Sequence, residues 1–130
     1  LATDADPRLL ARARRACYPG SSLRQLPANW RAAFERSGDE FCLSPEYRTP
    51  VRFLELDIRR DLPTGRFDLI LCRNLVFTYF QAPIQVVIAG RLAEVIVPGG
   101  LLLLGSHESL PTVVPGLAQE RPWLYRRAMT

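Results

Sequence analysis

Residues 67–74 read Phe-Asp-Leu-Ile-Leu-Cys-Arg-Asn, a short apolar run that ends in two polar side chains. Such a run is typical of a central strand in a parallel sheet, where both faces of the strand are covered. An amphipathic helix is expected over residues 83–97, because apolar side chains recur there on one stripe and residues 98–100, Pro-Gly-Gly, end it. Residues 101–104, four leucines, then form the next buried strand. This order predicts a parallel α/β sheet with right-handed crossovers.

The same alternation of strand and helix is expected on either side of this unit. Residues 1–3 read as the end of a strand, and Asp6 with Pro7 provides the N-cap and first turn of a helix that ends at residues 18–20. Three further elements are expected: a short helix over residues 29–36, a strand over residues 51–56 and a closing hairpin over residues 117–128. We expect one α/β domain over residues 1–130, with a hairpin or small β insertion at about residues 34–53.

The composition narrows the class of protein. Hydrophobic residues make up 48% of the 130 residues and charged residues 23%, which is the balance of a globular domain. No run approaches the roughly 18 apolar residues that a membrane-spanning helix needs, so membrane insertion is not expected. The net charge is +4, and all 17 basic residues are arginines scattered along the chain. That pattern indicates a codon bias rather than a phosphate-binding surface, and it argues against a nucleic-acid partner.

The cysteines bear on the redox compartment. Cys17, Cys42 and Cys72 form an odd set without a CxxC pair or a histidine cluster. This pattern predicts reduced thiols in a cytoplasmic protein, and it fits neither a metal site of the zinc type nor a disulfide scaffold.

Ligands of parallel α/β sheets bind beyond the carboxyl ends of the strands. A carboxylate at Asp4 is placed there to accept hydrogen bonds from both hydroxyls of a ribose, whereas Asp6 suits a helix cap; alternatively, both only cap the helix. Asp57 could accept from the amino group of an adenine beside the Ile58 backbone, or it lies in a solvated turn. Four segments fall at such strand ends: residues 4–6, 57–58, 73–74 and 105–108.

Several segments resemble one family, and they keep the same order along the chain. Residues 13–27 carry an Arg-Arg-x-x-Tyr-Pro pattern, residues 72–74 read Cys-Arg-Asn, and Tyr79-Phe80 and the Pro-Gly-Gly at 98–100 follow. Together they resemble the CheR-type methyltransferases, which transfer methyl groups from S-adenosylmethionine to glutamates of chemotaxis receptors. The resemblance implies a Rossmann-like class I methyltransferase sheet with helices on both faces. It also implies S-adenosylmethionine as cofactor, S-adenosylhomocysteine as product and an acidic protein substrate such as a receptor signalling helix.

Carried over residue by residue, the resemblance implies a cofactor site. Asp4 would hold the ribose, and Asp57 and Ile58 would frame the adenine. Arg73 and Asn74 would line the cofactor pocket.

The same resemblance makes Tyr79 the expected catalytic position, near the methyl group and the incoming carboxylate. The alternatives are a half-buried core aromatic for Tyr79 and an ion pair with Asp68 for Arg73. The loop before Tyr79 is one residue longer than the usual family pattern. The chain also has Gly-Ser-His-Glu-Ser-Leu at 105–110 where the family usually shows Gly-His-Ser-Glu-Ser-Leu, so His107 inherits no role. These departures suggest a divergent branch.

The family's first strand and its glycine-rich loop have no counterpart in this sequence. In the family topology that strand is central, between the strands expected to end at Thr3 and Cys72. We therefore expect a carboxyl-terminal part of a longer catalytic domain, inactive by itself. Because unpaired strand edges invite association, homo-oligomers or exchange of a strand between copies are also expected.

Three rival functions are considered beside glutamate methylation. One is a methyltransferase for a small molecule or a nucleic acid, although the Cys-Arg-Asn-Leu loop at 72–75 is unlike the Asn-Pro-Pro-Tyr-like loops of base methylation. Another is a catalytically silent binding module with the same fold. A nicotinamide-dependent dehydrogenase ranks last, because the Gly-x-Gly-x-x-Gly loop is missing.

Overall fold

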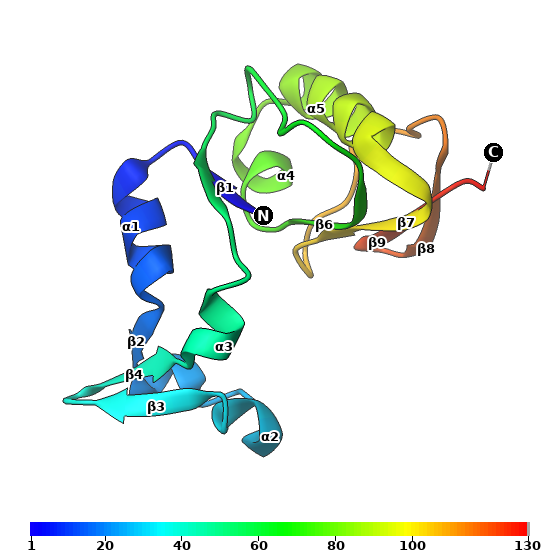
Figure 1. The fold of residues 1–130 in the computed structure, drawn as a ribbon. Helices are drawn as coiled ribbons and strands as arrows, with labels where there is room; N and C mark the ends of the chain where they lie inside the picture. Colours follow the sequence, from blue (N-terminus) through cyan, green and yellow to red (C-terminus); the bar gives the residue numbers. More distant parts are fainter. Residues whose placement is uncertain (130) are drawn as a thin grey trace. The chain divides into compact units, whose positions relative to one another are not determined.

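The computed structural model describes residues 1–129 and divides into two compact units, Leu1–Asp57 and the residues from Ile58 onward. The strands form three sheets, of which the first unit contains a pair and a triplet and the second unit contains four strands (Figure 1). None of the helices in the described residues is long and apolar enough to cross a membrane.

The first unit begins with a parallel strand pair and a capped helix. Strand β1 (Ala2–Asp4) pairs in parallel with β5 (Phe53–Glu55). Helix α1 (Pro7–Arg15) begins after its N-cap Asp6, whose carboxylate accepts a hydrogen bond from the amide nitrogen of Arg8 at 2.8 Å. The predicted N-cap and the proline in the first turn are therefore confirmed.

The rest of the first unit is built around a small antiparallel sheet. Strand β4 (Glu40–Leu43) is its centre, flanked by β2 (Cys17–Pro19) and β3 (Phe34–Ser37). The β3–β4 hairpin turns at Gly38, whose φ of +61° is readily adopted by glycine. Three short helical segments complete the unit: η1 (Gly20–Leu23), α2 (Ala28–Arg31) and α3 (Pro45–Arg48).

The helix expected over residues 29–36 is wrong in its second half. Helix α2 ends at Arg31, and residues 34–37 form β3 instead. The hydrogen-bonded ladder to β4 satisfies the backbone of these residues, and this long-range pairing overrides a weak local preference for helix.

A disulfide joins two of the cysteines, which overturns the expectation of three reduced thiols. The antiparallel pairing of β2 with β4 sets Cys17 directly opposite Cys42, and their sulfur atoms are bonded. Cys72 is free and buried. The register of two strands 25 residues apart cannot be read from cysteine spacing, which is why the sequence pattern was misleading. The cysteines therefore do not indicate a cytoplasmic protein.

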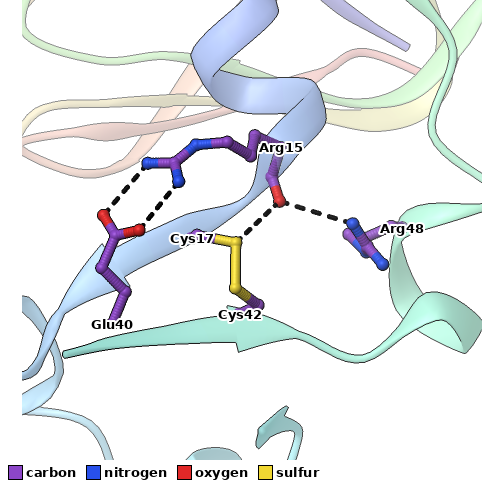
Figure 2. A network of polar contacts seen from close by, with 5 residues as sticks. All are labelled: Arg15, Cys17, Glu40, Cys42 and Arg48. Atoms are coloured by element: carbon purple, nitrogen blue, oxygen red, sulfur yellow. Dashed lines mark hydrogen bonds and ion pairs between the residues drawn. A yellow bond between two sulfur atoms is a disulfide. The ribbon is translucent and has the colours of Figure 1, made fainter. Parts of the chain in front are cut away.

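Arg15 ties the end of α1 to this sheet (Figure 2). Its guanidinium donates two hydrogen bonds to the Glu40 carboxylate, at 2.8 and 3.0 Å. The Arg48 guanidinium lies 3.4 Å from the Arg15 carbonyl oxygen, and Sγ of Cys17 lies 3.3 Å from the same oxygen. A disulfide sulfur carries no proton, so this last approach becomes a hydrogen bond only when the cysteine is reduced.

The second unit contains the predicted strand–helix–strand core. Strand β6 (Phe67–Cys72) runs parallel to β7 (Ile96–Leu104), and α4 (Val76–Tyr79) and α5 (Ala82–Val95) connect them. The predicted strands and the long helix between them are confirmed, with the second strand starting earlier than expected.

The predicted closing hairpin extends the same sheet. Strand β9 (Leu124–Arg127) pairs antiparallel with β7, and β8 (Leu117–Arg121) forms the outer strand. The largest fully buried side chains of the unit come from α4, α5 and β7: Val76, Ile88, Ile96, Leu102 and Leu104.

Strand β6 is covered on one face only within the described residues. Ile70 packs against the core and Cys72 is buried, whereas Leu69 is 50% exposed and Leu71 is 63% exposed. The expectation of a strand covered on both faces is therefore wrong for this unit. Strands β1 and β6 belong to separate sheets, and no strand in residues 1–129 pairs with both of them.

Candidate functional site

Asp4 and Asp57 lie at the same end of the parallel β1–β5 pair. Asp4 is the last residue of β1, and its carbonyl oxygen accepts from the Leu56 amide at 2.9 Å, which brings the two strand ends side by side. Oδ1 of Asp4 accepts from the Asp6 amide at 2.8 Å, while Oδ2 accepts no hydrogen bond from the described residues. The helix cap is Asp6, so Asp4 is a partly buried carboxylate with an acceptor left for a ligand.

Ile58 is the first residue of the second unit, and the side chain of Arg91 in α5 binds the turn that begins there. Nη2 of Arg91 donates to the Arg60 carbonyl oxygen at 3.0 Å, and Nη1 lies 3.5 Å from the carbonyl oxygens of Ile58 and Arg59. One guanidinium thus gathers three successive carbonyl groups, which fixes the backbone beside the expected adenine position.

The loop after β6 carries three predicted site residues on exposed positions. Arg73 and Asn74 follow β6 directly, and Tyr79 ends α4 with 74% of its surface exposed. Asn74 has a φ of +55°, a left-handed conformation that asparagine adopts more readily than most residues. In the described part of the chain, Arg73 makes no ion pair with Asp68, and Tyr79 is no core aromatic. Both side chains are therefore available to a ligand.

Glu108 lies in the segment after β7, and its carboxylate accepts hydrogen bonds that hold the loop after β6 in place. Its carboxylate accepts hydrogen bonds from the Asn74 amide at 2.8 Å, the Gly105 amide at 2.6 Å and the Thr78 hydroxyl at 2.5 Å. The side chain is only 5% exposed, so a charged group is buried here with its acceptors filled.

The pKa of Glu108 reflects two opposing causes. Burial disfavours the charged carboxylate and raises the pKa, but the hydrogen bonds, chiefly those from Thr78, Asn74 and Gly105, together outweigh it. The net result is a pKa below the ordinary value, so Glu108 is ionised at neutral pH.

The chemical groups of Asp4 and Asp57, each taken by itself, suit the parts of S-adenosylmethionine that the sequence prediction assigned to them. A ribose presents two hydroxyl donors, and Asp4 offers a carboxylate oxygen without a donor from the described residues. An adenine amino group suits a second carboxylate at Asp57, beside a fixed backbone at Ile58. Asp4 and Asp57 belong to the first unit and Ile58, Arg73, Asn74 and Tyr79 to the second. The role of each residue stays a prediction.

The fold defines a class of protein. It is similar to the solved structure of the N-methyltransferase NodS from Bradyrhizobium japonicum WM9, with a TM-score of 0.54. The likeness covers 97% of this chain and 71% of that chain at 13% sequence identity, so it concerns the fold alone. The chain has the Rossmann-like α/β fold of class I methyltransferases.

The sequence then defines the family. Residues 1–121 match the CheR methyltransferase, SAM binding domain, and the chain belongs to the CheR methyltransferase family. The cofactor of this domain is S-adenosylmethionine. The family and the cofactor implied by the sequence resemblance are confirmed.

Two curated relatives are similar over most of this chain. The chemotaxis protein methyltransferase of Listeria innocua serovar 6a is 36% identical over 111 residues, which are 85% of this chain and 42% of that protein. The probable chemotaxis protein methyltransferase of Rhizobium etli is 37% identical over 114 residues, which are 83% of this chain and 42% of that protein. The chain thus spans less than half the length of these relatives.

Two residues of the candidate site were not singled out by sequence reasoning. Glu108 lies in a segment that was placed at a strand end, but a lone glutamate in a turn carries no signal of three converging donors. Arg91 is one of many arginines, and only the fold brings it against the carbonyl groups of residues 58–60.

Proposed function

We propose that the protein is an S-adenosylmethionine-dependent O-methyltransferase that methylates glutamate carboxylates of a receptor or signalling protein in a chemotaxis-like pathway. The match of residues 1–121 to the CheR methyltransferase domain is the observation that carries this proposal. The names of the relatives support the substrate class. Because the chain spans only 42% of these relatives, the activity is proposed for the complete gene product.

The binding roles follow from the acceptors and donors at the strand ends. Asp4 accepts hydrogen bonds from the ribose hydroxyls, and Asp57 with the Ile58 backbone frames the adenine. Arg73 and Asn74 line the cofactor pocket from the loop that Glu108 holds. Tyr79 lies beside the incoming carboxylate and helps to align it.

The chemistry needs little from the protein except alignment. When bound, S-adenosylmethionine supplies a methyl group activated by its sulfonium. A substrate glutamate with a pKa near 4.3 is already ionised at neutral pH, so no general base is required. Its oxygen forms the new bond to the methyl carbon while the sulfur–methyl bond breaks and leaves its electron pair on sulfur, and no proton moves. Orientation and partial dehydration of the carboxylate are then the main tasks of the site, with Tyr79 aligning the carboxylate and Arg73 positioning the cofactor.

The partner is proposed to be an acidic protein segment such as a receptor signalling helix. A cytoplasmic location is proposed from that substrate class alone, because the cysteines do not support it. Association between copies through unpaired strand edges remains part of the proposal, because β1 and β6 each have an edge without a ladder in the described residues.

The test is methyl transfer by the complete gene product to the cytoplasmic domain of a chemotaxis receptor from the same organism. We expect incorporated label to be released by mild base as methanol, because carboxyl methyl esters hydrolyse whereas methylated amines do not. Arg73→Ala should reduce the affinity for S-adenosylhomocysteine. The matched control is Arg66→Ala, an exposed arginine that precedes the amino end of the same strand. Base-stable label would contradict glutamate methylation, and unchanged affinity in Arg73→Ala would contradict the role of Arg73.

A further inference from the structure

We propose that Glu108 is a positioning residue of the cofactor site, whose carboxylate fixes the turn that presents Arg73 and Asn74. The inference rests on the proposed function, because it concerns the site for S-adenosylmethionine. Glu108 itself is buried and acts through the backbone of the neighbouring loop.

The donors that reach Glu108 come from the carboxyl ends of two adjacent parallel strands. Oε2 accepts from the Gly105 amide, directly after β7, and from the Asn74 amide, two residues after β6. Oε1 accepts from the hydroxyl of Thr78 in α4. One carboxylate therefore joins the ends of both strands to the start of the helix between them.

The turn that carries Glu108 is itself fixed. The Glu108 amide donates to the Gly105 carbonyl oxygen at 2.9 Å, which closes the turn on its near side. At its far side the Leu110 amide donates to the hydroxyl of Tyr125 at 3.1 Å, and Tyr125 is buried in β9. The backbone of the Glu108 turn is thus fixed by contacts that do not involve the loop after β6.

The loop needs such a partner. Asn74 is left-handed and Leu75 has a φ of −137° and a ψ of −84°, so neither amide can join a strand or helix ladder. The Asn74 amide donates to Glu108 instead, at 2.8 Å. Without the carboxylate, the Asn74 amide would lose its acceptor, and the turn would relax toward a conformation that points Arg73 elsewhere.

A carboxylate is the group that these donors require. It offers acceptors only, whereas a glutamine amide would turn a second donor toward N–H groups that already donate. An aspartate is one methylene shorter and cannot reach both strand ends from the same backbone position. The core of the unit does not depend on Glu108, since its fully buried side chains come from α4, α5 and β7.

The test compares Glu108→Gln with Glu120→Gln in the complete gene product. Glu120 is an exposed carboxylate of β8 paired with Arg126, so the control makes the same chemical change away from the site. We expect Glu108→Gln to weaken binding of S-adenosylhomocysteine, measured by calorimetry at 25 °C, by roughly tenfold or more, and Glu120→Gln to leave it unchanged. Circular dichroism should show both variants folded at that temperature.

A double-mutant cycle separates positioning from a purely structural role. If Glu108 acts through Arg73, then adding Arg73→Ala to Glu108→Gln should cost little further affinity, within about threefold of the weaker single variant. Independent effects would multiply, and that result would overturn the inference. If Glu108→Gln does not fold, Thr78→Val removes one donor alone and takes its place in the cycle, with Thr78→Ser as the variant that restores binding.

The outcomes distinguish the two proposals. Failure of the unaltered gene product to bind S-adenosylhomocysteine would contradict the proposed function. Normal binding by the unaltered protein together with equal affinity in Glu108→Gln, or in Thr78→Val where that variant replaces it, would overturn the role of Glu108 alone.

Discussion

A β carbon built on Gly105 would lie 2.6 Å from Oε2 of Glu108. This β carbon would also lie 3.1 Å from Oδ1 of Asn74, so the space beside Gly105 is filled from two sides. The carboxylate cannot simply swing away, because three hydrogen bonds hold it. The missing side chain at Gly105 is therefore what lets Glu108 reach its amide at 2.6 Å.

Gly105→Ala should lower the free energy of unfolding of the second unit by about 1–3 kcal/mol, because the methyl group displaces the carboxylate or the strand end. The matched control is Gly90→Ala. Gly90 lies inside α5 with no atom within 4 Å of an added β carbon, so this change should raise the free energy by about 0.5–1 kcal/mol. Urea unfolding followed by Trp123 fluorescence, in a Trp30→Phe background, measures both. Equal effects of the two substitutions would contradict the packing at Gly105.

Acid should destabilise the second unit partly through Glu108. The pKa of Glu108 in the folded protein is below its ordinary value near 4.5, so its contribution is fully present above that value. The contribution is lost as the pH falls through the folded pKa, where the protonated carboxyl gives up its hydrogen bonds. Glu108→Gln should therefore flatten the pH dependence of unfolding below about pH 5 relative to the unaltered protein. Parallel pH curves for Glu108→Gln and the unaltered protein would contradict this assignment.

Reduction should loosen the small sheet of the first unit. The Cys17–Cys42 bond closes a separation of 25 residues, and loss of such a cross-link costs about 2–4 kcal/mol. Hydrogen exchange in residues 17–19 and 40–43 should speed up when a phosphine reductant is added. A Cys17→Ser/Cys42→Ser variant should exchange fast with and without reductant. If the reductant leaves the exchange rate of the unaltered protein unchanged, the two cysteines are not bonded to each other.

Cys72 should resist alkylation in the folded protein. It is 7% exposed, and burial is the main cause that raises its pKa to about 11. At pH 8 only about one thiol in a thousand is then the reactive thiolate. Iodoacetamide should label Cys72 only after denaturation, as read by mass spectrometry. Fast labelling of Cys72 in the native protein would contradict the burial of this side chain within the core of the second unit.

Local sequence patterns correctly predicted the elements that depend on interactions between residues close together in the chain. The apolar run at residues 67–72, the stripe of α5 and the Asp6-Pro7 helix start all appear in the structure. Each of these depends on periodicity or on a cap within a few residues, which a single sequence displays.

Features that depend on distant pairing could not be read in the same way. Residues 34–37 became a strand because β4 pairs with them, and Cys17 met Cys42 because β2 pairs with β4. Glu108 gains its role from donors 30 and 34 residues earlier. The family resemblance predicted the identity of the cofactor, but the role of Glu108 in holding the loop could be recognised only from the three-dimensional structure.

Calorimetric titration of the complete gene product with S-adenosylhomocysteine tests the central claim most directly. We predict saturable binding that Asp4→Asn and Arg73→Ala both weaken and that the Arg66→Ala control leaves intact. A folded gene product that shows no binding at all would contradict the account and favour a silent binding module with the same fold.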